Sequence, residues 1–388
     1  MDVISDTPAL DAFCSRLAQT SFVTVDTEFM RERTYWPQLC LIQLAGPEEA
    51  ACVDVLAEGI DLAPVFALMK DESVLKVFHA ARQDLEIFFH LSGRLPAPLF
   101  DTQVAAMVCG FGDQAGYETL VKKLTSASID KSSRFTDWAQ RPLTEKQIKY
   151  ALADVTHLRR VYEKLEGKLG ANGRRQWLEE EMGVLTHNGT YEADPQRAWL
   201  RIKSKSTKPR FLAVLREVAA WRERQAQEKD LPRGRVLRDD ALVEIAHHTP
   251  KSVDDLTRTR GLGRRLAEGD GGRGLLDAVE AGLAMPEEDC PKPSVKETLP
   301  RGLGPVSDLL KVLLKMKCNE HDVAQKLLAS SSDIDRIAAD GESAKVPALS
   351  GWRRQVFGQD ALELRAGRLA MVINDKKMEL VEFEEDEA

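Results

Sequence analysis

The sequence lacks the cysteine patterns of a zinc site or a disulfide framework. It contains no Cys-x-x-Cys pair and no short regular cysteine spacing. We therefore expect reduced thiols, mostly buried, in a cytoplasmic protein without zinc. The six cysteines are Cys14, Cys40, Cys52, Cys109, Cys290 and Cys318.

The sequence also lacks long hydrophobic runs and a secretory signal. Its apolar stretches fall well short of a membrane span, so we expect no membrane partner. The first residues, Met1–Asp6, are acidic and lack the basic segment followed by an apolar stretch that opens a signal peptide. An excess of positive charge is missing too. The formal charge of −8 counts mildly against a nucleic-acid partner, although its local distribution matters more than its sum.

What is present is an ordinary soluble composition, 30% charged and 43% hydrophobic, in 388 residues that suffice for two or three domains. Three strand-like runs at residues 22–25, 39–44 and 51–55 are joined by short links, which favours an antiparallel meander. Helical and strand patterns then alternate, and a long helix is predicted after Thr144, with Gln147 completing a capping box. This order predicts a mixed sheet covered by helices.

Beyond about residue 190 the strand signal fades, and small helical domains separated by linkers are predicted. Residues 196–216 hold seven basic side chains and no acidic one, which suits a solvated linker or a track for RNA. The two helical parts resemble each other loosely, as a weak internal repeat. The acidic end is expected to be disordered. The predicted division is 1–190 for the first domain, 191–207 for a basic linker, 208–286 for a helical domain, 287–305 for a second linker, 306–374 for a second helical domain and 375–388 for an acidic tail.

The stretch Thr24–Phe29 places two carboxylates close together. Side chains alternate across a strand, so Asp26 and Glu28 share one face and repel each other. A turn at a strand end would explain an isolated Asp-x-Glu. A cation bound between the two carboxylates would explain it as well, provided that further ligands lie elsewhere in the chain.

Two further aspartates complete a candidate ligand set. Asp84 is expected on the second turn of a helix, where the helix dipole alone would favour it. Tyr150 and Asp154 are four residues apart on one helix and share a face. Four carboxylates without histidine or cysteine suit Mg²⁺ or Mn²⁺. We predict two divalent ions, with Tyr150 orienting the attacking water and metal supplying most of its activation, because a tyrosine pKa is about 10.

The same residues resemble the motifs of a known family. Asp26-Thr27-Glu28, His79-x-x-x-x-Asp84 and Tyr150-x-x-x-Asp154 resemble the three motifs of the DEDDy 3′→5′ exonucleases. Further stretches are similar to ribonuclease D: 27–31, 34–39, 42–44, 100–103, 130–132 and 136–144. This likeness is strong to about residue 170. The helical region resembles the helicase-and-RNase-D C-terminal (HRDC) domain at Leu231-Pro232, 239–242, Pro250 and Leu256, and 306–372 resembles a second, degenerate copy.

The resemblance implies an α/β ribonuclease-H-like exonuclease domain followed by two small all-α HRDC-type domains. It implies hydrolysis of RNA from a single-stranded 3′ end, with tRNA precursors and other small structured RNAs as substrates and nucleoside 5′-monophosphates as products. A monomer is expected. Carried over to this sequence, the metal ligands are Asp26, Glu28, Asp84 and Asp154, and Tyr150 positions the water.

Four other side chains are candidates for substrate contact, each with a structural alternative. Phe29 and Met30 either hold the terminal nucleotide by stacking or pack at the sheet edge. His79 either approaches the scissile phosphate or packs at a strand end, and Arg141 either contacts phosphate or anchors its loop. Two rival functions remain open. One is a DNA 3′→5′ exonuclease, since the same carboxylates serve both polymers, and the other is a non-catalytic RNA-binding protein.

Overall fold

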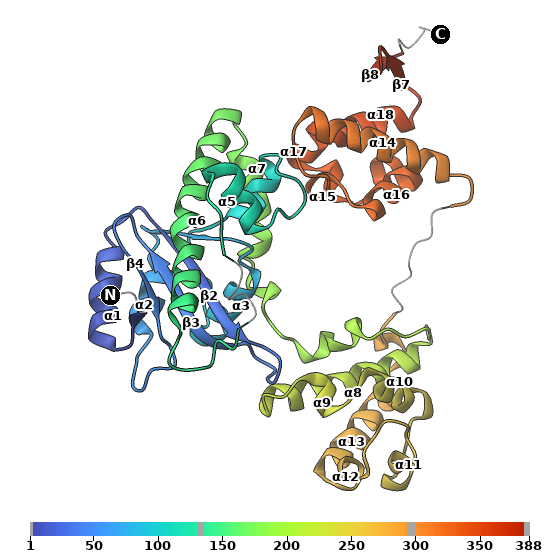
Figure 1. Ribbon diagram of the computed structural model, residues 1–388. Coiled ribbons are helices and arrows are strands. Elements are labelled where there is room, and N and C mark those ends of the chain that lie inside the picture. The colour runs from blue at the N-terminus through green and yellow to red at the C-terminus, as the bar shows by residue number, and fades with distance from the viewer. Residues whose placement is uncertain (1–2, 131–135, 293–299, 384–388) are drawn as a thin grey trace.

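The computed structural model describes residues 3–130, 136–292 and 300–383 (Figure 1). Its first part is built on a six-stranded sheet of order β1-β4-β3-β2-β5-β6. The central strands β2, β3 and β4 pair antiparallel, whereas β5 and β6 run parallel to β2. The predicted meander and mixed sheet are therefore confirmed. The strands are β1 (Val3–Ile4), β2 (Phe22–Met30), β3 (Gln38–Ala45), β4 (Ala50–Val53), β5 (Leu75–Phe78) and β6 (Leu99–Asp101).

Helices cover both faces of this sheet (Figure 1). Helices α1, α2 and α3 share one hydrophobic cluster with the buried valines of β2, and α6 packs with β3 and β4 around another. The long helix α6 begins after Thr144, whose capping box with Gln147 is confirmed. The helices are α1 (Thr7–Leu17), α2 (Ala63–Lys70), α3 (Arg82–Ser92), α4 (Thr102–Val108), α5 (Tyr117–Thr125), α6 (Glu145–Asn172) and α7 (Arg175–Leu185).

The middle part of the chain is helical and has a hydrophobic cluster of its own. The 3₁₀ helix η2 (Pro195–Arg201) belongs to this unit, because Ala198 and Ile202 are buried against α8. Residues 191–207 are therefore not simply a solvated linker. Ala198 and Ile202 lie among basic residues, and their burial shows that one side of this stretch packs against the helical domain. The elements are η1 (Asn188–Thr190), η2, α8 (Pro209–Glu228), α9 (Arg233–Val236), α10 (Asp239–His248), α11 (Val253–Thr257), α12 (Arg264–Glu268), α13 (Asp270–Ala284) and η3 (Glu287–Asp289).

The last part combines helices with a β-hairpin, so the prediction of an all-α domain ending at residue 374 is wrong. The hairpin joins β7 (Leu369–Asn374) to β8 (Lys377–Glu382) through Asp375 and Lys376, which both have positive φ, as a two-residue hairpin turn requires. Disorder is wrong for residues 379–382 as well. The helices are α14 (Gly304–Glu320), α15 (Gln325–Leu328), α16 (Ser331–Asp340), η4 (Gly341–Ser343), η5 (Pro347–Leu349), α17 (Gly351–Arg353), the π-helical turn η6 (Arg354–Gly358) and α18 (Gln359–Arg365).

None of the helices in the described parts of the chain combines the length and the apolar character needed to span a bilayer. The predicted motif at residues 130–132 and the end of the acidic tail, 384–388, lie partly or wholly outside the described residues.

Candidate active site

Strand β2 and helix α6 bring three carboxylates together. Asp26, Glu28 and Asp154 each offer one oxygen, and these oxygens all lie within 4.8 Å of one another. Asp26 and Glu28 lie on the same face of β2 because side chains alternate along a strand, and that face is covered by α6. A register shift in the β2–β3 pairing follows Glu28 directly. Such irregularities re-aim side chains and occur next to active sites.

The electrostatics of this cluster favour a cation. Burial and the nearby Asp154 carboxylate raise the pKa of Asp26 well above its ordinary range. Three ionised carboxylates at this spacing repel one another, and a hard divalent cation is the ligand that removes this cost. Directly opposite Asp26 in the sheet, Gln43 is fully buried, and its side-chain amide has no hydrogen-bond partner in the described parts of the chain. The donor set and this unsatisfied polar group both fit a divalent metal site.

Asp84 lies next to the cluster but is not part of it. It stands in the first turn of α3, one turn earlier than expected, because the helix begins only at Arg82. Its Oδ1 accepts a 2.5 Å hydrogen bond from Thr27 Oγ1, which holds it on the other side of β2. Burial and the Asp26 carboxylate raise the pKa of Asp84 well above its ordinary range. Asp84 is therefore coupled electrostatically to Asp26.

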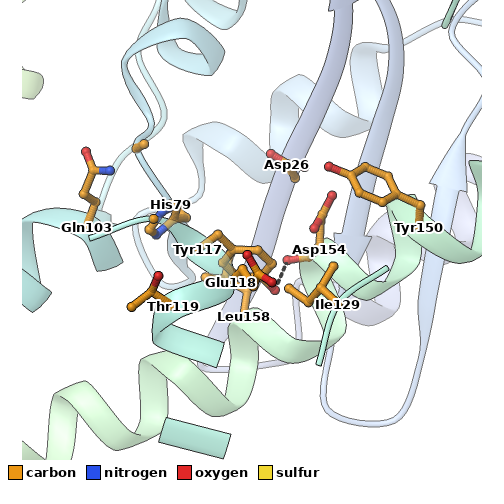
Figure 2. Close-up of a pocket in the computed structure, with 12 residues that line it drawn as sticks. Asp26, His79, Gln103, Tyr117, Glu118, Thr119, Ile129, Tyr150, Asp154 and Leu158 are labelled. Atoms are coloured by element: carbon orange, nitrogen blue, oxygen red, sulfur yellow. Dashed lines mark hydrogen bonds between the residues drawn. The ribbon is translucent and has the colours of Figure 1, made fainter. Parts of the chain in front are cut away.

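Tyr150 faces the cluster from α6, one turn before Asp154. Its side chain hydrogen-bonds the Asp154 carboxylate, and burial together with that carboxylate raises the pKa of the phenol above its ordinary value of 10. Figure 2 shows Asp26, Asp154 and Tyr150 pointing toward one another at one end of a pocket. A neutral hydroxyl beside three carboxylates can donate or accept a hydrogen bond at neutral pH, but it is a poor base.

The pocket has a volume of about 480 Å³, in the range of small-ligand sites. Its far wall comes from residues that sequence reasoning missed: Gln103 on α4, and Gly116, Tyr117, Glu118 and Thr119 around the start of α5 (Figure 2). Tyr117 donates hydrogen bonds to the backbone carbonyls of Asp154, at 2.7 Å, and Ala153. The local sequence, a glycine followed by a tyrosine at the start of a helix, does not indicate that the tyrosine supports the backbone at Asp154.

Of the four predicted substrate contacts, only His79 lines the pocket. Its Nδ1 lies 3.0 Å from Thr102 Oγ1, and burial, partly opposed by Asp101, lowers its pKa. Phe29 and Met30 pack against two different hydrophobic clusters, and neither lines the pocket.

Of the two roles considered for Arg141, its hydrogen bonds favour the loop anchor over contact with phosphate. All five of its N–H donors are used: two bind the carboxylate of Asp54, and the others bind the carbonyls of Cys40, Trp138 and Gln140. Arg141 therefore anchors the loop before α6 to β3 and to Asp54 after β4.

Comparison with known proteins agrees with this arrangement. Residues 1–170 match the 3′-5′ exonuclease family, and residues 211–279 match the HRDC domain. Ribonuclease D of Gluconacetobacter diazotrophicus is 51% identical over 379 residues, covering 98% of this chain and 96% of the relative. Ribonuclease D of Nitrobacter hamburgensis is 50% identical, covering 98% of this chain and 100% of the relative.

A solved structure is similar over nearly the whole chain as well. Escherichia coli RNase D, described as an exoribonuclease involved in structured RNA processing, superposes with a TM-score of 0.79 at 32% identity, covering 94% of this chain and 98% of that one. The carboxylate cluster, the pocket beside it and these full-length relatives agree: the chain belongs to the ribonuclease D family and is a metal-dependent 3′→5′ exoribonuclease.

Proposed function

We propose that this enzyme trims single-stranded 3′ tails from tRNA precursors and other small structured RNAs, releasing nucleoside 5′-monophosphates. The observation that carries the proposal is that Asp26 and Asp154, which cluster with Glu28, line one end of an open pocket large enough for a terminal nucleotide. An exonuclease needs a site that holds one chain end, and a pocket closed on one side by the catalytic groups suits that task.

We assign two Mg²⁺ or Mn²⁺ ions to the carboxylates of Asp26, Glu28, Asp84 and Asp154. When bound, such ions lower the pKa of a water molecule and offset charge on the leaving 3′ oxygen. The chain's own groups orient the reactants. Tyr150 holds the attacking water by its hydroxyl, and its raised pKa keeps that hydroxyl protonated at neutral pH. Asp84 would join the ligand set through its other carboxylate oxygen, while Thr27 Oγ1 keeps its hydrogen bond to Oδ1.

His79 is the one predicted substrate contact that we retain. It lies in the pocket, tilted against Tyr117 with ring centroids 5.3 Å apart. Its lowered pKa keeps the imidazole neutral near pH 7, so it can hydrogen-bond a ribose or phosphate oxygen without adding charge.

We also propose that the helices of the last part, α14 to α18, form a second, degenerate HRDC copy that is followed by the hairpin β7–β8. The first domain begins with helices of 20, 4 and 10 residues, α8, α9 and α10. The second begins with helices of 17, 4 and 10 residues, α14, α15 and α16. In both, the long helix is followed by an aspartate with positive φ, Asp230 (φ 47°) or Asp322 (φ 46°). The two helical domains would hold the RNA body, and the basic side chains at 197–216 would contact its phosphates.

We propose that the enzyme acts as a monomer in the cytoplasm. All six cysteines are free, five of them buried, which fits a reducing compartment.

A single assay tests the proposal. A 5′-labelled tRNA with a 3′ extension is incubated with Mg²⁺ or Mn²⁺, beside a DNA oligomer of matching sequence and beside Asp26→Asn. We expect stepwise shortening of the RNA from its 3′ end that stops at the folded tRNA and is absent in the variant. Equal shortening of the DNA would contradict the RNA assignment, and indifference to the tRNA structure would contradict the proposed substrate. Binding of RNA should weaken as salt rises, because phosphate contacts release counterions.

A further inference from the structure

We infer that the C-terminal helical domain positions the wall of the active-site pocket, although none of its described residues lines that pocket. The contact is made by residues 321–326, which include the turn after α14 and the start of α15. They dock on residues 107–116, which run from the end of α4 to the residue before α5. We call these the docking turn and the wall segment. Figure 1 shows α15 and α17 beside α5 and α7.

Backbone hydrogen bonds join the docking turn to the wall segment. Ala324 N donates to Met107 O at 3.0 Å, and Lys326 N donates to Asp113 Oδ1 at 3.0 Å. The short helix α15 has no side-chain cap of its own, so Asp113 of the catalytic domain supplies the acceptor for its first turn. Arg174 bridges the two parts by donating to the carbonyls of Val108 and Asp322.

The Asp322 side chain also packs closely against the backbone of Gly110. This glycine has φ +81°, and a Cβ placed on it would overlap the carboxylate of Asp322. Any side chain at this position must displace Asp322 or the wall segment. Glycine at this position therefore leaves room for the Asp322 side chain where it packs and adopts the positive φ without strain.

Further contacts between the C-terminal domain and helices of the catalytic domain hold the docking turn in place. A single hydrophobic cluster includes buried residues of α4 to α7 and of the C-terminal domain. Trp177 stacks on Trp352 with ring centroids 4.3 Å apart and an interplanar angle of 9°. Arg353 forms an ion pair with Glu181 in which both side chains are largely buried. The first helical domain has a separate hydrophobic cluster and contacts the catalytic domain at Tyr35 and Trp36. Asp230, the counterpart of Asp322, accepts from the backbone N–H groups of both residues, and the Tyr35 hydroxyl donates to Glu223.

The wall segment leads directly into the active site. It ends at Gly116, and Gly116–Thr119 line the pocket. Tyr117, the residue after Gly116, donates a hydrogen bond to the backbone carbonyl of Asp154. A shift of the wall segment therefore moves both the pocket wall and the support of Asp154. The docking turn therefore affects catalysis by positioning the wall segment, and this effect does not require the docking turn to contact RNA.

The first test uses two glycines of the same segment. Gly110→Ala places a methyl group against Asp322, whereas Gly112→Ala has the same kind of backbone penalty (φ +90°) with nothing within 4 Å of the added Cβ. We expect kcat/KM to fall about tenfold in Gly110→Ala and about twofold or less in Gly112→Ala. Adding Asp322→Gly to Gly110→Ala removes the clashing carboxylate and should restore most of the activity. Equal losses in the two single variants, or no rescue, would overturn the inference.

The second test separates positioning from direct binding of RNA. Asp113→Ala removes the acceptor for Lys326 N, and Asp113→Asn keeps an acceptor oxygen. We expect Asp113→Ala to lower kcat/KM roughly fivefold on a tetranucleotide and on a tRNA-length RNA alike, with Asp113→Asn close to wild type. A loss confined to the long RNA would mean that the docking turn matters only for how the C-terminal domain holds the RNA body, and would overturn the inference. Unchanged activity on both substrates would mean that the wall segment keeps its shape without the docking turn. Melting temperatures, measured in parallel, must lie above the assay temperature for all variants.

Discussion

Thr27 Oγ1 donates a 2.5 Å hydrogen bond to Asp84 Oδ1, and both side chains are buried. Thr27 stands between Asp26 and Glu28, so alternation along β2 turns it to the opposite face. The middle residue of the first motif thereby holds the aspartate of the second motif. The two motifs are linked by this contact and by the electrostatic coupling of Asp84 to Asp26.

Replacing Thr27 by valine should impair catalysis without unfolding the protein. The change keeps the shape of the side chain but leaves a buried carboxylate without its hydroxyl donor, which costs roughly 1–3 kcal/mol. We expect a loss of about tenfold in kcat/KM and a higher Mn²⁺ concentration for half-maximal activity. Thr27→Ser, which keeps the hydroxyl, is the control. Equal activity of the valine and serine variants would show that the hydrogen bond is not needed.

Asp26→Asn should have opposite effects on stability with and without metal. Burial and Asp154 raise the pKa of Asp26, so its ionised form destabilises the metal-free protein at neutral pH. In EDTA we expect the variant to be more stable by on the order of 1 kcal/mol. With Mn²⁺ the order should reverse, because the wild type gains a ligand-binding contribution that the variant lacks. Thermal unfolding in both conditions measures this, and an equal Mn²⁺ response in the two proteins would contradict the metal site.

Tyr150→Phe should lower kcat by roughly 10²-fold while leaving Mn²⁺ affinity nearly unchanged. The phenol orients a water molecule in our proposal and does not act as a metal ligand. Burial and Asp154 hold its pKa above 10, so it does not titrate from about pH 6 to about pH 9. The pH profile of kcat in that range should therefore keep its shape in the variant. An inflection that disappears with the hydroxyl would show that Tyr150 is a titrating base.

Because of Lys76, the stability of the folded protein depends on pH in the alkaline range. Its side chain is fully buried in β5 and donates to the carbonyls of Asp71 and Ala97. Burial, partly opposed by Asp71 and Glu72, lowers its pKa from 10.5 to about 8. The unfolded chain keeps this proton to higher pH than the folded protein does, so stability rises as pH increases from about 8 to 10.5.

Comparison with Lys76→Met isolates this contribution. The free energy of unfolding of the wild type, relative to the variant, should increase by roughly 1–3 kcal/mol between about pH 7 and about pH 10. Denaturant titrations at the two pH values measure the difference. A difference that stays constant would show that Lys76 keeps its ordinary pKa in the folded protein.

Local periodicity predicted much of the catalytic domain. The runs at 22–25, 39–44 and 51–55 mark strands β2, β3 and β4, although β2 continues to Met30 and β4 ends at Val53. The capping box at Thr144 marks the start of α6 as expected. The C-terminal hairpin was missed because acidic composition outweighed a weak turn signal at Asp375-Lys376. Ala198 and Ile202 were missed because two apolar residues in a basic stretch show no period.

The sequence by itself determined which side chains share a face: Asp26 with Glu28 on a strand, and Tyr150 with Asp154 on a helix. These relationships follow from the repeat of the backbone, which depends only on neighbouring residues. Only the tertiary structure decided that the two faces meet, that Asp84 turns to Thr27, and that Arg141 binds Asp54 instead of lining the pocket. It also decided that Gly110 lies against Asp322. Such contacts depend on how segments far apart in the chain pack together, and no local pattern carries that information.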